Sequence, residues 1–186
     1  MYMKIEKKVS FHYFFNILEF VYAKSLANND VSELLNKIKF VLYHFLIDSE
    51  KGRIALDKEL VFYKYYTELE NLRRQSNVFV NFNVLGQTGN YTITPLLFEP
   101  LVDNAMKHTK HDGNGRVDIK VVATNFPVLK FHCKNNYAPN SSCFTSFKSG
   151  LKIFEQRLEL YYKDNYTLKI IQDDGLYEVA LSIKTA

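Results

Sequence analysis

One segment, residues 95–108, constrains this chain more than any other, because it places polar side chains at helical spacing within an apolar stretch. Pro95 suits the first position of a helix, and the apolar residues after it recur every three or four positions, as on the buried side of an amphipathic helix. Asn104 lies three to four residues before Lys107 and His108, on one flank. An amide oxygen is a ligand for a hard divalent cation, and Lys and His offer positive charge to phosphate oxygens. The segment therefore predicts a helix that holds a metal-bound nucleotide, or, on spacing alone, a helix with a solvated polar edge.

The composition is that of an ordinary globular protein with room for one substantial core and a helical appendage. The chain has 186 residues, 47% of them hydrophobic and 24% charged, and a net charge of +4. Its basic residues are dispersed, which does not indicate nucleic-acid binding. Cys133 lies in an apolar alternating run and Cys143 in a polar loop, a pattern that favours two free thiols in a reducing compartment. The longest apolar run, residues 9–23, is short and contains polar residues, and no signal peptide precedes it, so we expect a soluble chain.

The first fifty residues predict two amphipathic helices joined by a short turn. Apolar residues follow helical spacing over 4–26, and Asp30 with Glu33 forms a possible capping box for a second helix through Leu46. A lone hairpin buries too little surface to be stable, so residues 1–52 predict a separate domain that forms a homodimer. The apolar stripes expected at the dimer interface contain Phe14, Leu18, Val21, Leu34, Ile38 and Leu42.

The remainder, residues 53–186, predicts an α+β domain. A helix is expected over 56–76 and another over 150–162, in addition to the helix that begins at Pro95. Apolar and polar residues alternate in the segments expected to be strands, which are 78–85, 91–93, 117–123, 128–133, 166–172 and 177–183. Residues 135–149 are polar and aperiodic, which indicates a functional loop. Mostly antiparallel strands with helices on one face make an α/β sandwich.

Three segments together resemble the LytS-like sensor histidine kinases, a branch of the GHKL nucleotide-binding superfamily. Residues 95–108 resemble the family's Asn-containing box, and residues 8–16 are similar to its phosphoacceptor box, which implies that His12 accepts the phosphoryl group. Phe11 stands where the family has Pro. Residues 56–73 look like the connecting helix, whose Tyr63 and Tyr66 we interpret as packing residues. The resemblance implies a dimerising helical hairpin followed by a GHKL (Bergerat-type) sandwich.

The same resemblance implies a site for ATP and Mg²⁺. Asn104 matches the metal-binding Asn, and Asn135, with Asn136 as the alternative, occupies the place of the residue that binds the adenine amino group. Tyr137 replaces the Gly usually found there. Residues 148–158 resemble the last box, in which Gly150, Leu151 and Lys152 match and Lys148 and Ile153 depart from the pattern.

The implied reaction transfers the ATP γ-phosphoryl group to His12 and then to an Asp of a response regulator. Positive charge would come from Lys107, His108 and Lys152, and the proton acceptor would be Asp103, Glu99 or water. The resemblance also implies a cytoplasmic transmitter domain of an inner-membrane sensor, joined to the membrane only through an upstream segment absent from this sequence. Two alternatives stay open: a degenerate kinase that acts as a dimeric signalling scaffold, and a basic domain that binds nucleic acid.

Overall fold

The computed structural model describes residues 17–18, 20–21, 24, 31–74, 78–110, 112–137, 144–173 and 175–185. For residue 32 and residues 144–150 only the backbone is described. His12, Asp30 and Cys143 lie outside the described residues, so the phosphoacceptor assignment stays a prediction. The N-cap of the helix that begins at Ser32 is Val31, with no side-chain cap, so the predicted capping box of Asp30 with Glu33 is wrong.

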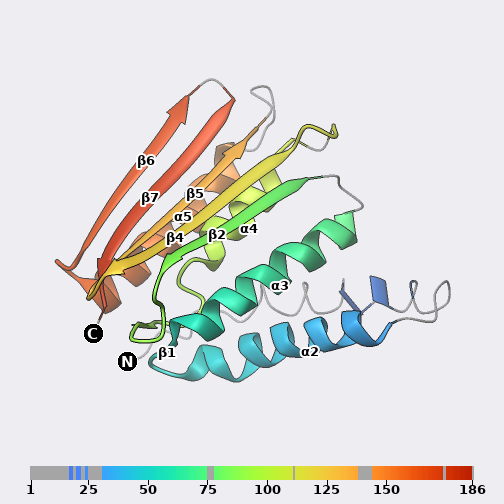
Figure 1. The fold of residues 1–186 in the computed structure, drawn as a ribbon. Coiled ribbons are helices and arrows are strands. Elements are labelled where there is room, and N and C mark those ends of the chain that lie inside the picture. The colour runs from blue at the N-terminus through green and yellow to red at the C-terminus, as the bar shows by residue number, and fades with distance from the viewer. Residues whose placement is uncertain are drawn as a thin grey trace.

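A five-stranded sheet forms the centre of the fold, in the order β2-β4-β5-β7-β6 (Figure 1). Its strands are β2 (Phe79–Gly86), β4 (Arg116–Asn125), β5 (Val128–Asn136), β6 (Tyr166–Asp173) and β7 (Leu176–Lys184). All neighbours pair antiparallel except β2 and β4, which pair parallel because the chain crosses over between them. The short strands β1 (Ile54–Ala55) and β3 (Thr92–Ile93) form a separate antiparallel pair. The predicted α+β class is confirmed.

Helices cover one face of this sheet. Along β4, Val117, Ile119 and Val121 are buried and alternate with more exposed residues, as the two-residue period of a one-sided sheet requires. The helices α4 (Glu99–His108) and α5 (Phe144–Tyr162) pack on the buried face and on each other (Figure 1). The long helix α3 (Leu56–Arg74) contacts α4, and α2 (Ser32–Leu46) packs on α3, followed by the short 3₁₀ helix η1 (Asp48–Glu50). In the described residues, no helix is both long and apolar enough to cross a bilayer.

Two helices begin at residues other than the predicted ones. Helix α4 begins at Glu99 and not at Pro95, because residues 95–98 form a buried turn in which Leu96 has a positive φ of 56°. Pro100, and not Pro95, lies in the first helical turn. Helix α5 begins at Phe144 and not at Gly150, and β5 continues to Asn136, so the predicted loop over 135–149 is wrong for most of its length. In the sequence, the apolar spacing of the later helix extends back to Phe147 and Phe144.

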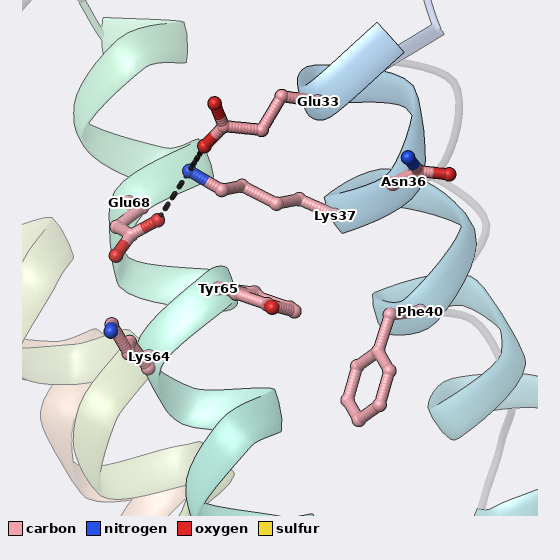
Figure 2. A pocket seen from close by; sticks show the side chains of 7 residues that line it. All are labelled: Glu33, Asn36, Lys37, Phe40, Lys64, Tyr65 and Glu68. Carbon is pink, nitrogen blue, oxygen red and sulfur yellow. Dashed lines mark ion pairs between the residues drawn. The ribbon is translucent and has the colours of Figure 1, made fainter.

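The α2 helix is fixed to α3 within one chain. Lys37 of α2 forms ion pairs of 2.8 Å with Glu33 of its own helix and with Glu68 of α3 (Figure 2). Two residues expected at the dimer interface are already covered by this chain, since Val21 is 7% exposed and Ile38 is 3% exposed. The apolar residues that remain exposed near or on this helix are Leu18, Leu35, Tyr43, Leu46 and Ile47. Dimerisation stays a prediction, and these residues replace Val21 and Ile38 as its expected contact surface.

Candidate nucleotide site

Asn104 and Asn135 lie on α4 and β5, two elements that pack against each other. Near the start of the helix, the Cys133 thiol contacts the carbonyl oxygen of Leu101 at 3.9 Å. Just beyond its end, Thr109 forms a β-bridge with Tyr137. Asn135 is two residues from both Cys133 and Tyr137, so it lies beside the stretch of α4 that carries the other polar residues of the box.

One amide in this region is buried without a hydrogen-bond partner among the described residues. Asn135 is 1% exposed, and neither its Nδ2 nor its Oδ1 atom is hydrogen-bonded. A buried amide without a partner is costly, so such groups in folded proteins usually bind a water, an ion or a ligand. The Asn135 side chain is therefore available to a bound group. Asn104 on α4 is also buried, at 8% exposure.

Asn136 has a different role. Its Oδ1 atom accepts hydrogen bonds from the Thr109 hydroxyl at 3.0 Å and from the Arg116 backbone N–H at 2.7 Å. Its Nδ2 atom donates to the carbonyl oxygen of Asn114 at 2.8 Å. The side chain thus joins the end of α4 to the start of β4, and the geometry favours Asn135 over Asn136 as the adenine-binding residue.

The two candidate carboxylates have contrasting surroundings. Burial, together with the negative charge of Asp103, raises the pKa of Glu99 to about 7, although Arg157 and Lys107 act in the opposite direction. Asp103 accepts a hydrogen bond from the Tyr66 hydroxyl at 2.9 Å and forms an ion pair with Lys107. A carboxylate with a pKa near neutrality is suited to receive a proton during catalysis.

The cationic residues are less closely grouped. Lys107 is exposed, and burial and the charge of Lys107 together lower the pKa of the half-buried His108, which favours its neutral form. On α5, Leu151 is half-buried and Lys152 is exposed, and Gly150 lies inside the helix and not at its N-terminus. Gly150 therefore does not open this helix, contrary to what the resemblance to the last box implies.

Comparison with known proteins shows similarity to histidine kinases. A model of the family described as Histidine kinase matches residues 2–78, the part of the chain that contains His12. The sensor histidine kinase/phosphatase LytS of Staphylococcus aureus strain MRSA252 is 31% identical over 121 residues, which are 63% of this chain and 21% of that protein. The chain spans about a fifth of the length of the curated LytS relatives that it matches.

The fold of this chain is similar to that of solved histidine kinases. The catalytic domain of histidine kinase ThkA superposes with a TM-score of 0.52 at 13% identity, covering 72% of this chain and 95% of that domain. The histidine kinase AdeS of Acinetobacter baumannii superposes with a TM-score of 0.53 at 13% identity, covering 87% of this chain and 83% of that one. At such low identity these structures support the fold of this chain and not its substrates.

Sequence reasoning missed the residues that hold the start of α4. The Arg157 Nη1 atom of α5 donates to the carbonyl oxygen of Leu96 at 2.9 Å, and the backbone N–H of Phe98 donates to the Tyr63 hydroxyl at 2.9 Å. Tyr63 and Tyr66 do pack in the core, as expected, but their hydroxyls also contact α4 and the residue before it. Two sequence features could have indicated these contacts: the position of Arg157 within residues 148–158, and the two tyrosine hydroxyls on α3.

Proposed function

We propose that this chain is the transmitter region of a sensor histidine kinase that binds Mg²⁺-ATP and phosphorylates His12. One observation carries the proposal. The amide of Asn135 on β5 is buried without a partner, and β5 packs on α4, which carries Asn104 and a carboxylate whose pKa is about 7. The resemblance of residues 95–108 to the Asn-containing box of LytS-like kinases supports a nucleotide site in this region.

The residues present fit the nucleotide and its metal. The Asn104 amide would provide a neutral oxygen to Mg²⁺, which, when bound, would reduce the charge repulsion of the phosphates. The Asn135 amide would accept a hydrogen bond from the adenine amino group. Lys107, His108 and Lys152 would lie toward the phosphates, although their positions in the structure allow them only a supporting role.

In the proposed reaction, a ring nitrogen of neutral His12 attacks the γ-phosphorus, so that an N–P bond forms and the bond to the β-phosphate oxygen breaks. ADP leaves, and the other ring nitrogen loses its proton to a base. Glu99 is the better candidate for that base, because Asp103 already accepts from Tyr66 and pairs with Lys107. A carboxylate with its pKa near 7 is half ionised at neutral pH and can take up this proton.

The later steps and partners are also proposals. The phosphoryl group would pass to an Asp of a response regulator receiver domain, and the chain would form a homodimer through its N-terminal helices. The chain would belong to the cytoplasmic side of a longer inner-membrane sensor, joined to the membrane through a segment outside this sequence.

The direct experiment is transfer of label from γ-labelled ATP. We expect Mg²⁺-dependent, acid-labile label on the unmodified chain and none on His12→Gln or Asn104→Ala. The first variant should still bind nucleotide, whereas the second should lose Mg²⁺-dependent binding. Label that persists in His12→Gln would overturn the phosphoacceptor assignment and leave the nucleotide site intact.

A second candidate function, the dimeric scaffold, is favoured by one observation. Tyr137, at a position where the family has Gly, is 8% exposed and its hydroxyl accepts a hydrogen bond from Gln172 at 3.2 Å, so it is part of the sheet structure. Equilibrium titration with Mg²⁺-ATP separates the two functions, because the scaffold predicts no binding or binding without label.

A further inference from the structure

A chain of buried polar groups runs from α2 to the start of α4, and the proposed phosphoryl transfer does not use it. The His44 Nε2 atom lies 2.7 Å from Glu59 Oε2. The Tyr63 hydroxyl donates to Glu59 Oε1 at 2.5 Å and accepts from the backbone N–H of Phe98 at 2.9 Å. We call these four residues the buried hydrogen-bond chain. His44, Glu59, Tyr63 and Phe98 are each 0% exposed, so water does not compete for these bonds.

The last member of the buried hydrogen-bond chain is at a sensitive position. Phe98 is the N-cap residue of α4, and no side chain caps that helix. The turn before it contains the left-handed Leu96, a conformation that is unfavourable for a non-glycine residue. The Tyr63 hydroxyl therefore helps to fix a strained turn that is followed at once by Glu99.

A second contact from the next turn of α3 acts on the same helix. Tyr66, three residues after Tyr63, donates its hydroxyl proton to Asp103, the residue before Asn104. Tyr63 and Tyr66 are both buried and so have little rotamer freedom. A displacement of α3 would consequently move both the start of α4 and the Asp103 side chain, which precedes the proposed metal ligand Asn104.

The first member of the buried hydrogen-bond chain belongs to the N-terminal helices. His44 lies in the last turn of α2, and its Nδ1 atom is 3.3 Å from the buried Asp48 of η1. The opposite end of α2 is attached to α3 by the ion pair of Lys37 with Glu68 (Figure 2). Because the His44 and Glu59 side chains are both fully buried, sliding α2 along α3 would separate a pair that no water can replace.

We propose that the buried hydrogen-bond chain is a positioning device that makes the geometry of the nucleotide site depend on the position of α2. Glu59 and Tyr63 are positioning residues and do not touch the reacting groups. The inference rests on the proposed function for its effect on phosphoryl transfer, but its structural part is independent of that function. A signal that shifts α2 would then change the transfer rate through α4.

The first test measures the Phe98 amide directly. Tyr63→Phe removes the only hydroxyl in the buried hydrogen-bond chain, and we expect hydrogen exchange at Phe98 to accelerate about tenfold, as for the loss of one buried hydrogen bond. Tyr65→Phe is the matched control, because Tyr65 lies on the same helix but packs its ring on Phe40 of α2. Its exchange at Phe98 should equal that of the unmodified chain.

The second test asks whether α2 takes part. His44→Gln should also accelerate hydrogen exchange at Phe98. Exchange at Phe98 in the double variant with Tyr63→Phe should be no faster than in Tyr63→Phe alone, since both replacements interrupt the same buried hydrogen-bond chain. Glu59→Gln can still accept from Tyr63 and donate to His44 Nε2 in its other tautomer, so it should retain slow exchange. Slow exchange at Phe98 in His44→Gln would overturn the proposal, as would faster exchange in the Tyr65→Phe control.

The third test is the rate of label transfer from ATP. In Tyr63→Phe and His44→Gln we expect kcat to fall about tenfold while the KM for ATP changes less than about twofold, because an altered position of Glu99 affects the transition state and not nucleotide binding. An equal loss in KM would indicate general unfolding of the site and overturn the proposal. If the unmodified chain takes no label, the proposed function fails, and the Phe98 exchange still decides whether the buried hydrogen-bond chain operates.

Discussion

The replacement Glu99→Gln tests the electrostatics of the site. Gln has nearly the shape of Glu but cannot ionise, so the variant removes only the charge. In the folded chain the pKa of Glu99 is about 7, against an ordinary value of 4.5, because burial and the Asp103 charge disfavour the carboxylate. A folded pKa above the unfolded value means that ionisation costs stability. The loss begins as the pH rises above 4.5 and is complete above about pH 7.

The size of the effect follows from the two pKa values. The difference corresponds to about 3 kcal/mol of unfolding free energy, at about 1.4 kcal/mol for each pKa unit, and contact of the carboxylate with water reduces this to about 2–3 kcal/mol. We therefore expect Glu99→Gln to be about 2–3 kcal/mol more stable than the unmodified chain at about pH 8, relative to their difference at about pH 4.5. Denaturant unfolding at a series of pH values measures this, because the midpoint shifts without a change in slope.

The control variant is Glu155→Gln, which removes a charge from an exposed position on α5 and should show no comparable dependence on pH. A stability difference between Glu99→Gln and the unmodified chain that stays constant from about pH 4.5 to about pH 8 would refute the reasoning. The same variant should also transfer label from ATP more slowly, because Gln cannot accept a proton from His12. Higher stability combined with lower activity would show that the charge is retained for function.

Three further predictions concern individual side chains. Asn136→Ala should cost about 2 kcal/mol in unfolding free energy, since three hydrogen bonds are lost, and denaturant unfolding measures it. Burial alone would raise the pKa of Asp48, but hydrogen bonds from Lys51 and Lys58 outweigh it and lower that pKa, so Asp48→Asn should be destabilising at neutral pH. That deficit should vanish as the pH falls below the folded pKa, and an unchanged deficit in acid would contradict the assignment. Burial raises the pKa of Cys133 to about 12, so mass spectrometry should find it unalkylated in the folded chain at about pH 8 and alkylated after unfolding.

The sequence by itself determined the elements whose pattern is local. The alternation over 117–123 and 128–133 predicted the β4–β5 hairpin, and the helical spacing over 56–76 predicted α3, which the structure describes from Leu56 to Arg74. The ordered boxes also indicated the resemblance to histidine kinases, because Asn104 and its neighbours are adjacent in the chain. Such features depend on residues within a few positions of one another, so periodicity and motif spacing are sufficient to predict them.

Only the tertiary structure decided which polar groups meet. Phe98 and Tyr63 are 35 residues apart, and Leu96 and Arg157 are 61 apart, so no local pattern indicates either contact. The same holds for the choice between Asn135 and Asn136, since neighbouring residues in a strand point to opposite faces and only the packed sheet shows which face is covered. The pKa of Glu99 is likewise set by burial beneath elements from distant parts of the chain. Sequence patterns specify the elements, whereas desolvation and long-range contacts arise only when those elements pack together.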